Sequence, residues 1–378
     1  MNALLTSVSD PDGRPILDAA TRAEVGRAPI RTVADLDRAI DAARSAQPGW
    51  AALGHAERSR LLHLVADDLD AHADELGEIV TAEQGKIDGA GEVHGAAHWL
   101  RAAADTVLEP QVLREEGASR TELHYVPLGV VASIGPWNFP VMISVWHIAP
   151  ALRMGNTVVM KPSENTPLSV LALAEIFRRH LPSDVVTAVS GDREVGAALA
   201  AHPDVAKIVF TGSTPTGRRI VESSAHNLAR LTLELGGNDA GIVLPGTDVQ
   251  AVADRLFWGA FMNTGQVCAA LKRLYVHDSV YDEVVAALAE RAEAAPMGSG
   301  HDKGNRLGPV QNPAQFDIVS RLVDDARERG GRIVTGGEPA ADLGPLFYRA
   351  TIVADVEDGA AIVDEEQFGP VLPVVRYT

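Results

Sequence analysis

The sequence predicts an α/β protein of two domains, and three observations lead to that fold class. The chain has 378 residues, more than the roughly 250–300 residues at which single hydrophobic cores stop growing. From Val126 onward, short apolar and β-branched runs alternate with amphipathic segments. Several runs end at glycine or proline, as residues 126–134 do before Gly135 and Pro136. Strands that alternate with helices form mostly parallel sheets wrapped by helices, so we expect that arrangement here.

The individual elements follow from the spacing of apolar residues. Apolar residues recur three and four positions apart over 32–46 and 57–80, which predicts two N-terminal helices. Further helices are expected at 168–182, 195–203, 215–225, 249–260 and 280–295. Strands are expected at 126–134, at the start of 156–164, and at 185–191, 205–213, 230–237, 239–244 and 273–277. We place a domain boundary near residues 234–237, because the motifs change in character there.

Composition excludes several classes of protein. The formal net charge is −18, which argues against nucleic acid or an anionic membrane as the main partner. A single cysteine excludes an internal disulfide framework and fits a reducing compartment. The N-terminal residues lack a basic region followed by an apolar run, and no stretch of about 18 apolar residues occurs. We therefore expect a cytoplasmic protein without a membrane or nucleic-acid partner, and we expect no metal site.

Two segments have features of a nucleotide site. In residues 209–220, an expected strand runs into Gly212 and Ser213, and a helix opens near Pro215 with Thr214 as its N-cap. The free N–H groups of such a helix suit a pyrophosphate, although an ordinary capped turn has the same pattern. In residues 158–167, Lys161 and Glu164 follow a buried strand, where open sheets bind ligands. These two side chains suit ribose hydroxyls, and a solvated ion pair is the alternative.

Three further segments carry groups suited to catalysis. Asn138 lies in a proline-bracketed apolar loop, where a buried amide can hold an oxyanion or can complete a turn. Glu234 interrupts an apolar strand before two glycines, a setting in which desolvation raises the pKa of a general base; a strand-end glutamate facing water is the alternative. Cys268 is the only cysteine, and by itself it is equally a small buried hydrophobe. Residues 364–374 run from acidic residues through an aromatic–Gly–Pro bend into a strand.

Together the motifs resemble one family. PWNFP, KPSE, FTGS, ELGG, GQVC and EEQFGP occur in the order, and at about the spacing, of the NAD(P)-dependent aldehyde dehydrogenase superfamily. EQGK, ALRMGNTVVMKPSE and LGPVQN match further parts of the same pattern, so the resemblance spans nearly the whole chain. It implies a Rossmann-type NAD-binding domain at 1–233, with a small oligomerisation β hairpin at about 113–130. It also implies an α/β catalytic domain at 234–378 and, for the full-length protein, a homodimer or homotetramer.

The resemblance also implies the catalytic roles. Cys268 would attack the aldehyde carbon, and the Asn138 amide with the Cys268 backbone N–H would hold the oxyanion. After hydride transfer, Glu234 would activate the water that hydrolyses the thioester. A cysteine nucleophile needs surroundings that activate its thiol, because a free thiol is only slightly ionised at neutral pH.

The cofactor implied is NAD, with NADP possible. The residues that match the family's cofactor contacts are Lys161, Glu164, Gly212, Ser213, Glu366 and Phe368, with Trp137 and Gln315 as weaker candidates. Glu164 favours NAD, because a carboxylate there would repel a 2′-phosphate.

The family pattern also indicates an apolar acyl pocket. The corresponding residues are Phe139, Met142, Ile143, Trp146, Val267 and Ala269, which suggests a medium-sized aliphatic or aromatic aldehyde as the substrate. The position after Trp146 is often lysine in relatives and is His147 here.

Two rival functions stay open. A CoA-acylating aldehyde dehydrogenase usually lacks the ELGG glutamate that this chain has as Glu234. The second rival is a catalytically impaired fragment or a binding protein of the same fold. It stays open because the chain ends at Thr378, shortly after EEQFGP, whereas relatives continue. A cut sequence, a natural short form and an inactive fragment would each explain that end, and we expect truncation of a longer protein.

Overall fold

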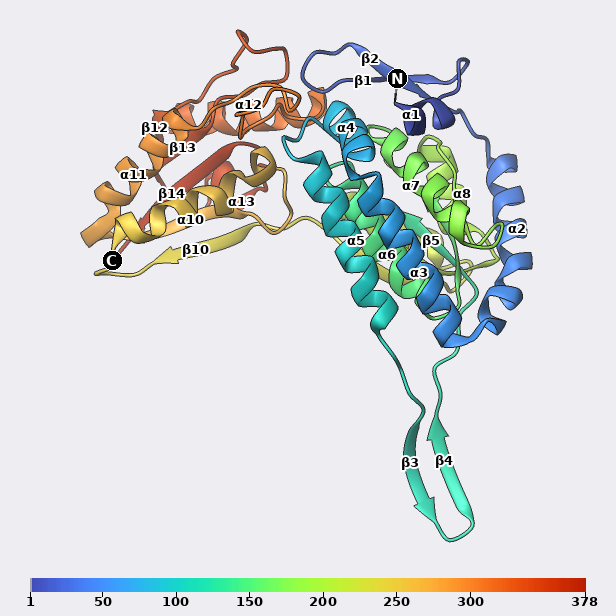
Figure 1. Ribbon diagram of the computed structural model, residues 1–378. Coiled ribbons are helices and arrows are strands. Elements are labelled where there is room, and N and C mark those ends of the chain that lie inside the picture. Colours follow the sequence, from blue (N-terminus) through green and yellow to red (C-terminus); the bar gives the residue numbers. More distant parts are fainter. Residues whose placement is uncertain (1) are drawn as a thin grey trace. The chain divides into compact units, whose positions relative to one another are not determined.

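The computed structural model describes residues 2–378, which divide into two compact units (Figure 1). Unit 1 consists of the chain up to Pro15, together with Gly26–Ile79 and Gly89–Leu235. Unit 2 consists of Ile16–Val25, Val80–Asp88 and Gly236–Thr378. The main boundary therefore falls inside the ELGG motif. Two short N-terminal segments belong to unit 2, and no feature of their sequence indicates this.

A five-stranded parallel sheet forms the centre of unit 1, with the strand order β7-β6-β5-β8-β9. Its strands are β5 (Val130–Ile134), β6 (Thr157–Lys161), β7 (Val186–Ala188), β8 (Val205–Thr211) and β9 (Arg230–Glu234). Every residue of β6 is buried, as are the first four of β5. Strands covered on both faces have such continuous apolar runs. The expected parallel sheet is confirmed.

Helices cover both faces of this sheet. The helices of this part of the chain are α1 (Ala3–Val8), α2 (Val33–Ala52), α3 (Gly54–Ala71), α4 (Ala73–Gln84), α5 (Gly89–Asp105), α6 (Pro140–Arg153), α7 (Pro167–His180), α8 (Arg193–Ala201) and α9 (Thr214–Ser224), of which α4 continues into unit 2 from Val80. Val130 and Ala132 of β5 share a hydrophobic core with residues of α2, α8 and α9. Ser133 points to the other face, since strand side chains alternate, and it contacts His147 of α6. Helix α6 therefore covers the opposite face.

Two expected elements differ from the structure. The single helix expected at 57–80 is wrong, because α3 and α4 are separated by His72, whose φ of −109° and ψ of 17° are not helical. The strand expected at 126–134 begins only at Val130. Gly129, just before it, has a φ of +127°, which glycine adopts without strain.

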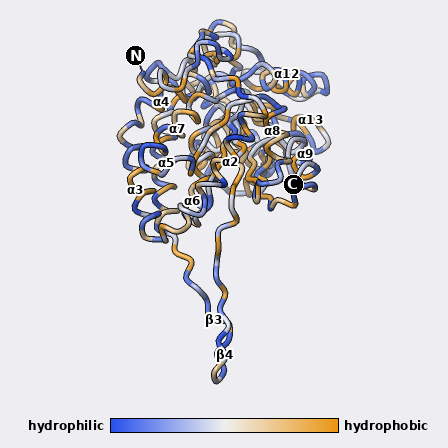
Figure 2. Tube along the Cα trace, turned by 90° about the vertical axis from the view of Figure 1, so that its right-hand side faces the viewer, coloured by the Kyte–Doolittle hydropathy of each residue, from blue (hydrophilic) through white to orange (hydrophobic). Residues whose placement is uncertain are grey.

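A hairpin extends from unit 1 (Figure 1). Strands β3 (Gln111–Glu116) and β4 (Ser119–Leu123) pair in the antiparallel direction, and all of their residues are exposed. Figure 2 shows hydrophobic as well as hydrophilic residues along it, and the exposed apolar side chains include Val112, Leu113 and Leu123. The hairpin thus presents apolar groups that the rest of the described chain does not cover.

Unit 2 contains a second five-stranded sheet, with the order β10-β11-β14-β13-β12. Its strands are β10 (Asp239–Val243), β11 (Leu271–His277), β12 (Arg332–Thr335), β13 (Thr351–Val356) and β14 (Val371–Tyr377). The pairs are parallel except β12 with β13, which is antiparallel. One face packs against α10 (Val249–Phe261) and α11 (Tyr281–Ala294). The other packs against α12 (Pro313–Glu328) and α13 (Ala361–Asp364).

A two-stranded sheet of β1 (Arg14–Leu17) and β2 (Glu24–Ala28) completes the fold. Within residues 2–378, no helix has the length and hydropathy needed to cross a membrane.

Candidate active site

The loop after β5 carries Asn138, which is 3% exposed, so its amide lies in the protein interior. Helix α6 begins two residues later, and Glu92 of α5 fixes its first turn. Glu92 Oε1 accepts hydrogen bonds from the main-chain N–H groups of Val141 (2.8 Å) and Met142 (3.0 Å). A carboxylate at this position satisfies two N–H groups without helical partners and complements the helix dipole. Glu92 therefore holds the start of α6, and with it the adjoining loop of Asn138.

Lys161 and Glu164 form an ion pair at the carboxyl end of β6. Lys161 is 4% exposed. Its Nζ donates to the carbonyl of Pro162 (3.0 Å) and to Glu164 Oε1 (2.8 Å). The Glu164 side chain keeps 44% of its surface exposed. A buried ammonium thus orients a carboxylate that remains accessible to a ligand.

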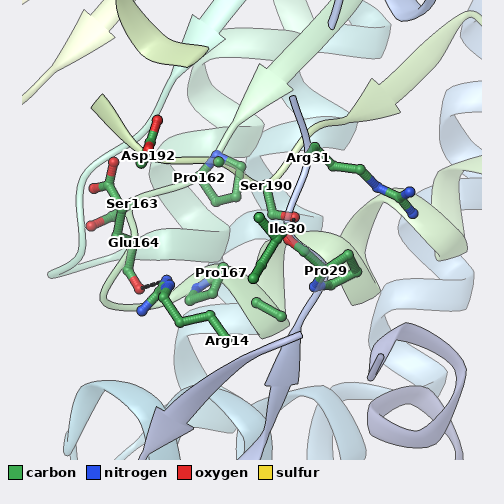
Figure 3. Close-up of a pocket in the computed structure, with 12 residues that line it drawn as sticks. Arg14, Pro29, Ile30, Arg31, Pro162, Ser163, Glu164, Pro167, Ser190 and Asp192 are labelled. Atoms are coloured by element: carbon green, nitrogen blue, oxygen red, sulfur yellow. Dashed lines mark hydrogen bonds between the residues drawn. The ribbon is translucent and has the colours of Figure 1, made fainter. Parts of the chain in front are cut away.

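A cavity of about 150 Å³ adjoins this loop (Figure 3). Its lining includes Arg14, Arg31, Glu164, Ser190 and Asp192. Figure 3 shows Arg14 directed at Glu164, where its Nη2 donates to the main-chain carbonyl, and Arg31 directed away. Since β6 and β7 end here, the cavity lies where open parallel sheets bind ligands.

The turn after β8 joins the FTGS and ELGG motifs. The N–H of Gly212 donates to the carbonyl of Glu234 (3.0 Å). A Cβ at Gly212 would lie 2.6 Å from the ring of Phe210, so this position requires glycine. Ser213 is the N-cap of α9, and its hydroxyl accepts a hydrogen bond from a helix N–H. The N-cap expected at Thr214 is therefore wrong by one residue. The turn leads into a helix N-terminus of the kind that holds phosphate.

Glu234 is the last residue of β9 and is exposed. Of the two settings left open for Glu234, the structure shows the strand-end glutamate facing water, and only the middle residues of β9 are half-buried. Its carboxylate is accessible to water.

A buried polar chain links β5, α6 and β8. His147 lies between two hydroxyls, with Nδ1 3.0 Å from Ser133 Oγ and Nε2 2.8 Å from Thr211 Oγ1. Burial lowers the pKa of His147 to about 4, so the imidazole is neutral at physiological pH. Thr211 precedes Gly212, so the chain connects the helix after the Asn138 loop to the turn before α9.

In unit 2, Cys268 follows a turn with an unusual backbone. Asn263, Thr264 and Gly265 have φ values of 50°, 57° and 73°. Non-glycine residues rarely adopt this left-handed region, least of all a β-branched one. The exposure of Cys268 is intermediate, although Gln266, two residues before it, is buried.

Buried hydrogen bonds hold this turn against the loop 308–311. The Thr264 hydroxyl accepts from the N–H of Gly308 (2.8 Å) and donates to its carbonyl (3.3 Å). The Gln266 side chain donates to the carbonyl of Pro309 (3.2 Å) and accepts from the N–H of Gln311 (2.9 Å). An accessible thiol is thus attached to a fixed backbone.

The EEQFGP segment lies near the same turn. Burial raises the pKa of Glu366, and the ammonium of Lys272 partly opposes that rise. Glu366 Oε1 is buried without a hydrogen-bond partner. Lys272 Nζ lies 5.0 Å from the ring centre of Phe368, and Gln315 Nε2 donates to the carbonyl of Gln367 (2.8 Å). The structure therefore brings Gln315, Glu366 and Phe368 into one region of unit 2.

The residues expected to line an acyl pocket divide into two groups. Phe139, Met142 and Trp146 are half-buried or exposed on α6 and the residue before it. The Trp146 ring centre lies 5.6 Å from that of Trp99 on α5. Ile143, in contrast, is 3% exposed and belongs to the core. Beside Cys268, Val267 is 9% exposed and Ala269 is exposed.

Comparison with known proteins identifies the family. The aldehyde dehydrogenase family model matches residues 7–378. A probable aldehyde dehydrogenase of a Pseudomonas species is 38% identical over 375 residues, which cover 98% of this chain and 76% of that protein. The chain belongs to the aldehyde dehydrogenase family. A phenylacetaldehyde dehydrogenase of Pseudomonas fluorescens is also 38% identical, over 96% of this chain and 76% of its own.

A solved structure agrees with this membership. The NAD+ complex of an aldehyde dehydrogenase from Bacillus cereus superposes with a TM-score of 0.93 at 34% identity, covering 96% of this chain and 76% of that one. In the chain described here, the family motifs occupy the carboxyl ends of β5, β6, β8 and β9 in unit 1. In unit 2 they occupy the loops of Cys268 and Glu366.

Each unit contains residues that fit a part of a dinucleotide. The accessible carboxylate of Glu164 and the helix N-terminus after Ser213 suit a ribose and a pyrophosphate. The unpartnered Glu366 Oε1 provides a buried acceptor for a hydroxyl donor. Across the described residues, His, Cys, Asp and Glu form no group of three that could hold a metal ion.

Sequence reasoning missed three residues of these regions: Glu92, Arg14 and Lys272. For Glu92 and Arg14 no local signal exists, because each acts on a segment distant in the sequence. Lys272 had a signal. Alternate residues of β11 are buried, which places Lys272 on the inward face with Leu274 and Val276.

Proposed function

We propose that this chain oxidises an aldehyde to the carboxylic acid with NAD(P)+ through a thioester on Cys268. The observation that carries the proposal is the setting of Cys268, the only thiol of the chain, which stays accessible on a turn fixed by buried hydrogen bonds. A nucleophile must reach its substrate while its backbone stays in place. Membership of the aldehyde dehydrogenase family supports the same role.

In the first step, the Cys268 thiolate adds to the aldehyde carbon. A C–S bond forms, and the carbonyl π electrons move to oxygen. The side-chain amide of Asn138 and the backbone N–H of Cys268 donate hydrogen bonds to that oxyanion. The amide suits this task because Asn138 is buried next to a helix start that Glu92 fixes.

In the second step, the oxyanion re-forms the carbonyl and the hydride leaves, which gives a thioester on Cys268. The cofactor, when bound, accepts that hydride. Its adenosine side would be held by Lys161, Glu164, Gly212 and Ser213, and its nicotinamide side by Glu366, Phe368, Trp137 and Gln315.

In the third step, Glu234 removes a proton from water, and the hydroxide attacks the thioester. The C–S bond breaks, the acid leaves, and the thiolate is restored. The role rests on the place of Glu234 in the ELGG motif, and its carboxylate at the end of β9 is accessible to the water it would activate.

The first rival is transfer of the acyl group to CoA. Glu234 argues against it, because a carboxylate that activates water has no task there. The second rival is a fold without turnover, and the retention of Asn138, Glu234 and Cys268 argues against it.

For the substrate, we propose an apolar aliphatic or aromatic aldehyde. Phe139, Met142 and Trp146 present apolar surface, and Trp99 extends it through its contact with Trp146. The phenylacetaldehyde dehydrogenase among the relatives agrees with this choice. Comparison of kcat/KM for hexanal, benzaldehyde and succinic semialdehyde tests it, and preference for the charged semialdehyde would refute it.

We propose further that the β3–β4 hairpin joins copies of the chain in a homo-oligomer. Its exposed Val112, Leu113 and Leu123 support this, since apolar groups in a projecting hairpin gain stability when covered. The single cysteine fits a cytoplasmic location, where thiols stay reduced. Light scattering of the protein with and without L113D tests the oligomer.

The test of the reaction is formation of NADH from benzaldehyde and NAD+. We expect turnover by the wild type and none by C268A. Sustained turnover by a folded C268A would overturn the mechanism, and release of benzoyl-CoA when CoA is added would favour the first rival.

A further inference from the structure

The buried charges of unit 2 include Lys272, to which the proposed reaction gives no role. Lys272 is 1% exposed at the start of β11, four residues after Cys268. We propose that Lys272 is a positioning residue, which fixes the turn before Cys268 and favours the thiolate through its ammonium charge. The inference rests on the proposed role of Cys268 as the nucleophile.

The first support is the contact of Lys272 with the turn. Its Nζ donates a hydrogen bond to the carbonyl of Gly265, at 2.5 Å. Gly265 has a φ of +73°, and a Cβ there would lie 2.0 Å from the carbonyl oxygen of Gly369. The turn therefore packs directly on the EEQFGP segment. The hydrogen bond from Lys272 connects Gly265, the last left-handed residue of the turn, to β11.

The second support is the set of charges around the ammonium. Burial lowers the pKa of Lys272 to about 8, and the negative charges of Glu366, Cys268 and Asp239 oppose that fall. The ammonium is therefore still protonated near neutral pH. The Phe368 ring, 5.0 Å away, stabilises it further as a cation. Because a Coulomb interaction acts equally on both partners, a thiolate that favours the charged lysine is itself favoured by it.

A purely structural lysine would satisfy the Gly265 carbonyl and nothing more. Burying a charge for that task is costly, since a neutral amide donates the same hydrogen bond. Lys272→Gln separates the two roles, because it keeps an N–H donor and removes the charge.

The experiment measures alkylation of Cys268 by iodoacetamide as a function of pH. The thiolate displaces iodide and forms a C–S bond, so the rate follows the thiolate fraction. The chain has one cysteine, so intact mass reports on Cys268 alone. No aldehyde or cofactor is needed. An inactive wild type would therefore refute the proposed function and leave this test intact.

We expect K272Q to move the alkylation profile to higher pH and to slow the reaction about tenfold at neutral pH. K272R keeps the charge and should stay within about threefold of the wild type. Lys303, exposed in the same unit, provides the matched control, and K303M should change nothing.

A K272Q profile that coincides with those of the wild type and K303M overturns the proposal. Thermal unfolding checks that each variant folds. Should K272Q fail to fold, K272R still decides, because a folded K272R that reacts about tenfold more slowly would exclude a role for the charge.

Discussion

The two units place their functional groups by different means. In unit 1, Asn138, Lys161, Gly212 and Glu234 occur at the carboxyl ends of adjacent parallel strands, and none of them has a positive φ. In unit 2, the residues before Cys268 form a left-handed turn, and Phe368 also has a positive φ, of 47°. Sheet topology positions the first set without strain. Backbone strain of order 1–3 kcal/mol per residue accompanies the second, so buried polar contacts must hold it.

The comparison predicts that the side chains of Asn138 and Glu234 in unit 1 are replaceable one at a time without loss of the fold. Asn138→Ala removes an oxyanion donor, so kcat should fall about 10²–10³-fold. The KM for NAD+ should stay near the wild-type value, because the amide contacts the substrate oxygen and not the cofactor. Steady-state kinetics measure both, and an unchanged kcat would remove Asn138 from the mechanism.

A substitution in the turn before Cys268 should instead lower the stability and the activity of the protein together. Thr264→Ala leaves the buried N–H of Gly308 unpaired, which costs about 1–3 kcal/mol. Thr264→Ser keeps the hydroxyl and is the matched control. The free energy of unfolding, measured in urea, and kcat should both fall for T264A and remain near the wild-type values for T264S. Equal behaviour of the two variants would show that these hydrogen bonds do not hold the turn.

The buried histidine of unit 1 gives a pH dependence with a definite sign. His147 stays neutral in the folded protein down to a pKa of about 4, against 6.5 for the ordinary value. Unfolded chains therefore bind more protons between those values. The contribution of the neutral His147 to the free energy of unfolding is fully present above about pH 6.5. It is lost as the pH falls toward 4, by roughly 3 kcal/mol.

Replacement of the histidine tests this sign. His147→Gln can keep both hydroxyl contacts without titrating. The wild type should lose more stability than H147Q when urea unfolding is compared at about pH 7.5 and about pH 5. If the wild type and H147Q lose the same amount of stability, His147 is not the source of the pH dependence.

The smallest effect concerns the adenosine side. Glu164→Gln removes a carboxylate that repels a 2′-phosphate, so the ratio of kcat/KM for NADP+ to that for NAD+ should rise about tenfold. Glu175→Gln on α7, which loses only the contact with Arg178, is the control and should leave the ratio unchanged. If Glu164→Gln does not raise this ratio, the 2′-phosphate of NADP+ binds away from Glu164.

The same contrast explains what the sequence could reveal. The alternation of apolar runs and helices was sufficient for the sheet of unit 1, because parallel pairing follows from the order of the elements. The break at His72 and the start of β5 at Val130 depend on local conformation that periodicity does not encode. The sequence left both a buried and an exposed setting open for Glu234, because an apolar strand can end at a residue that faces solvent, and the structure shows the exposed one.

The support around the candidate site was less predictable than its motifs. Glu92 and Gln311 act on segments about 50 and 45 residues away, and such contacts exist only in the folded chain. The left-handed φ values of Asn263 and Thr264 have no signal in their residue types beyond the tolerance of asparagine for that region. Lys272 was the exception, since its inward position follows from the alternation of β11.

The central claim is that Cys268 carries the acyl group and that Glu234 releases it. The most direct test incubates Glu234→Gln with benzaldehyde and NAD+ and measures NADH and intact mass together. We predict a burst of one equivalent of NADH per chain and a protein heavier by one benzoyl group, which peptide mapping locates on Cys268. Sustained NADH formation by E234Q, or a burst that leaves Cys268 unmodified, would contradict it.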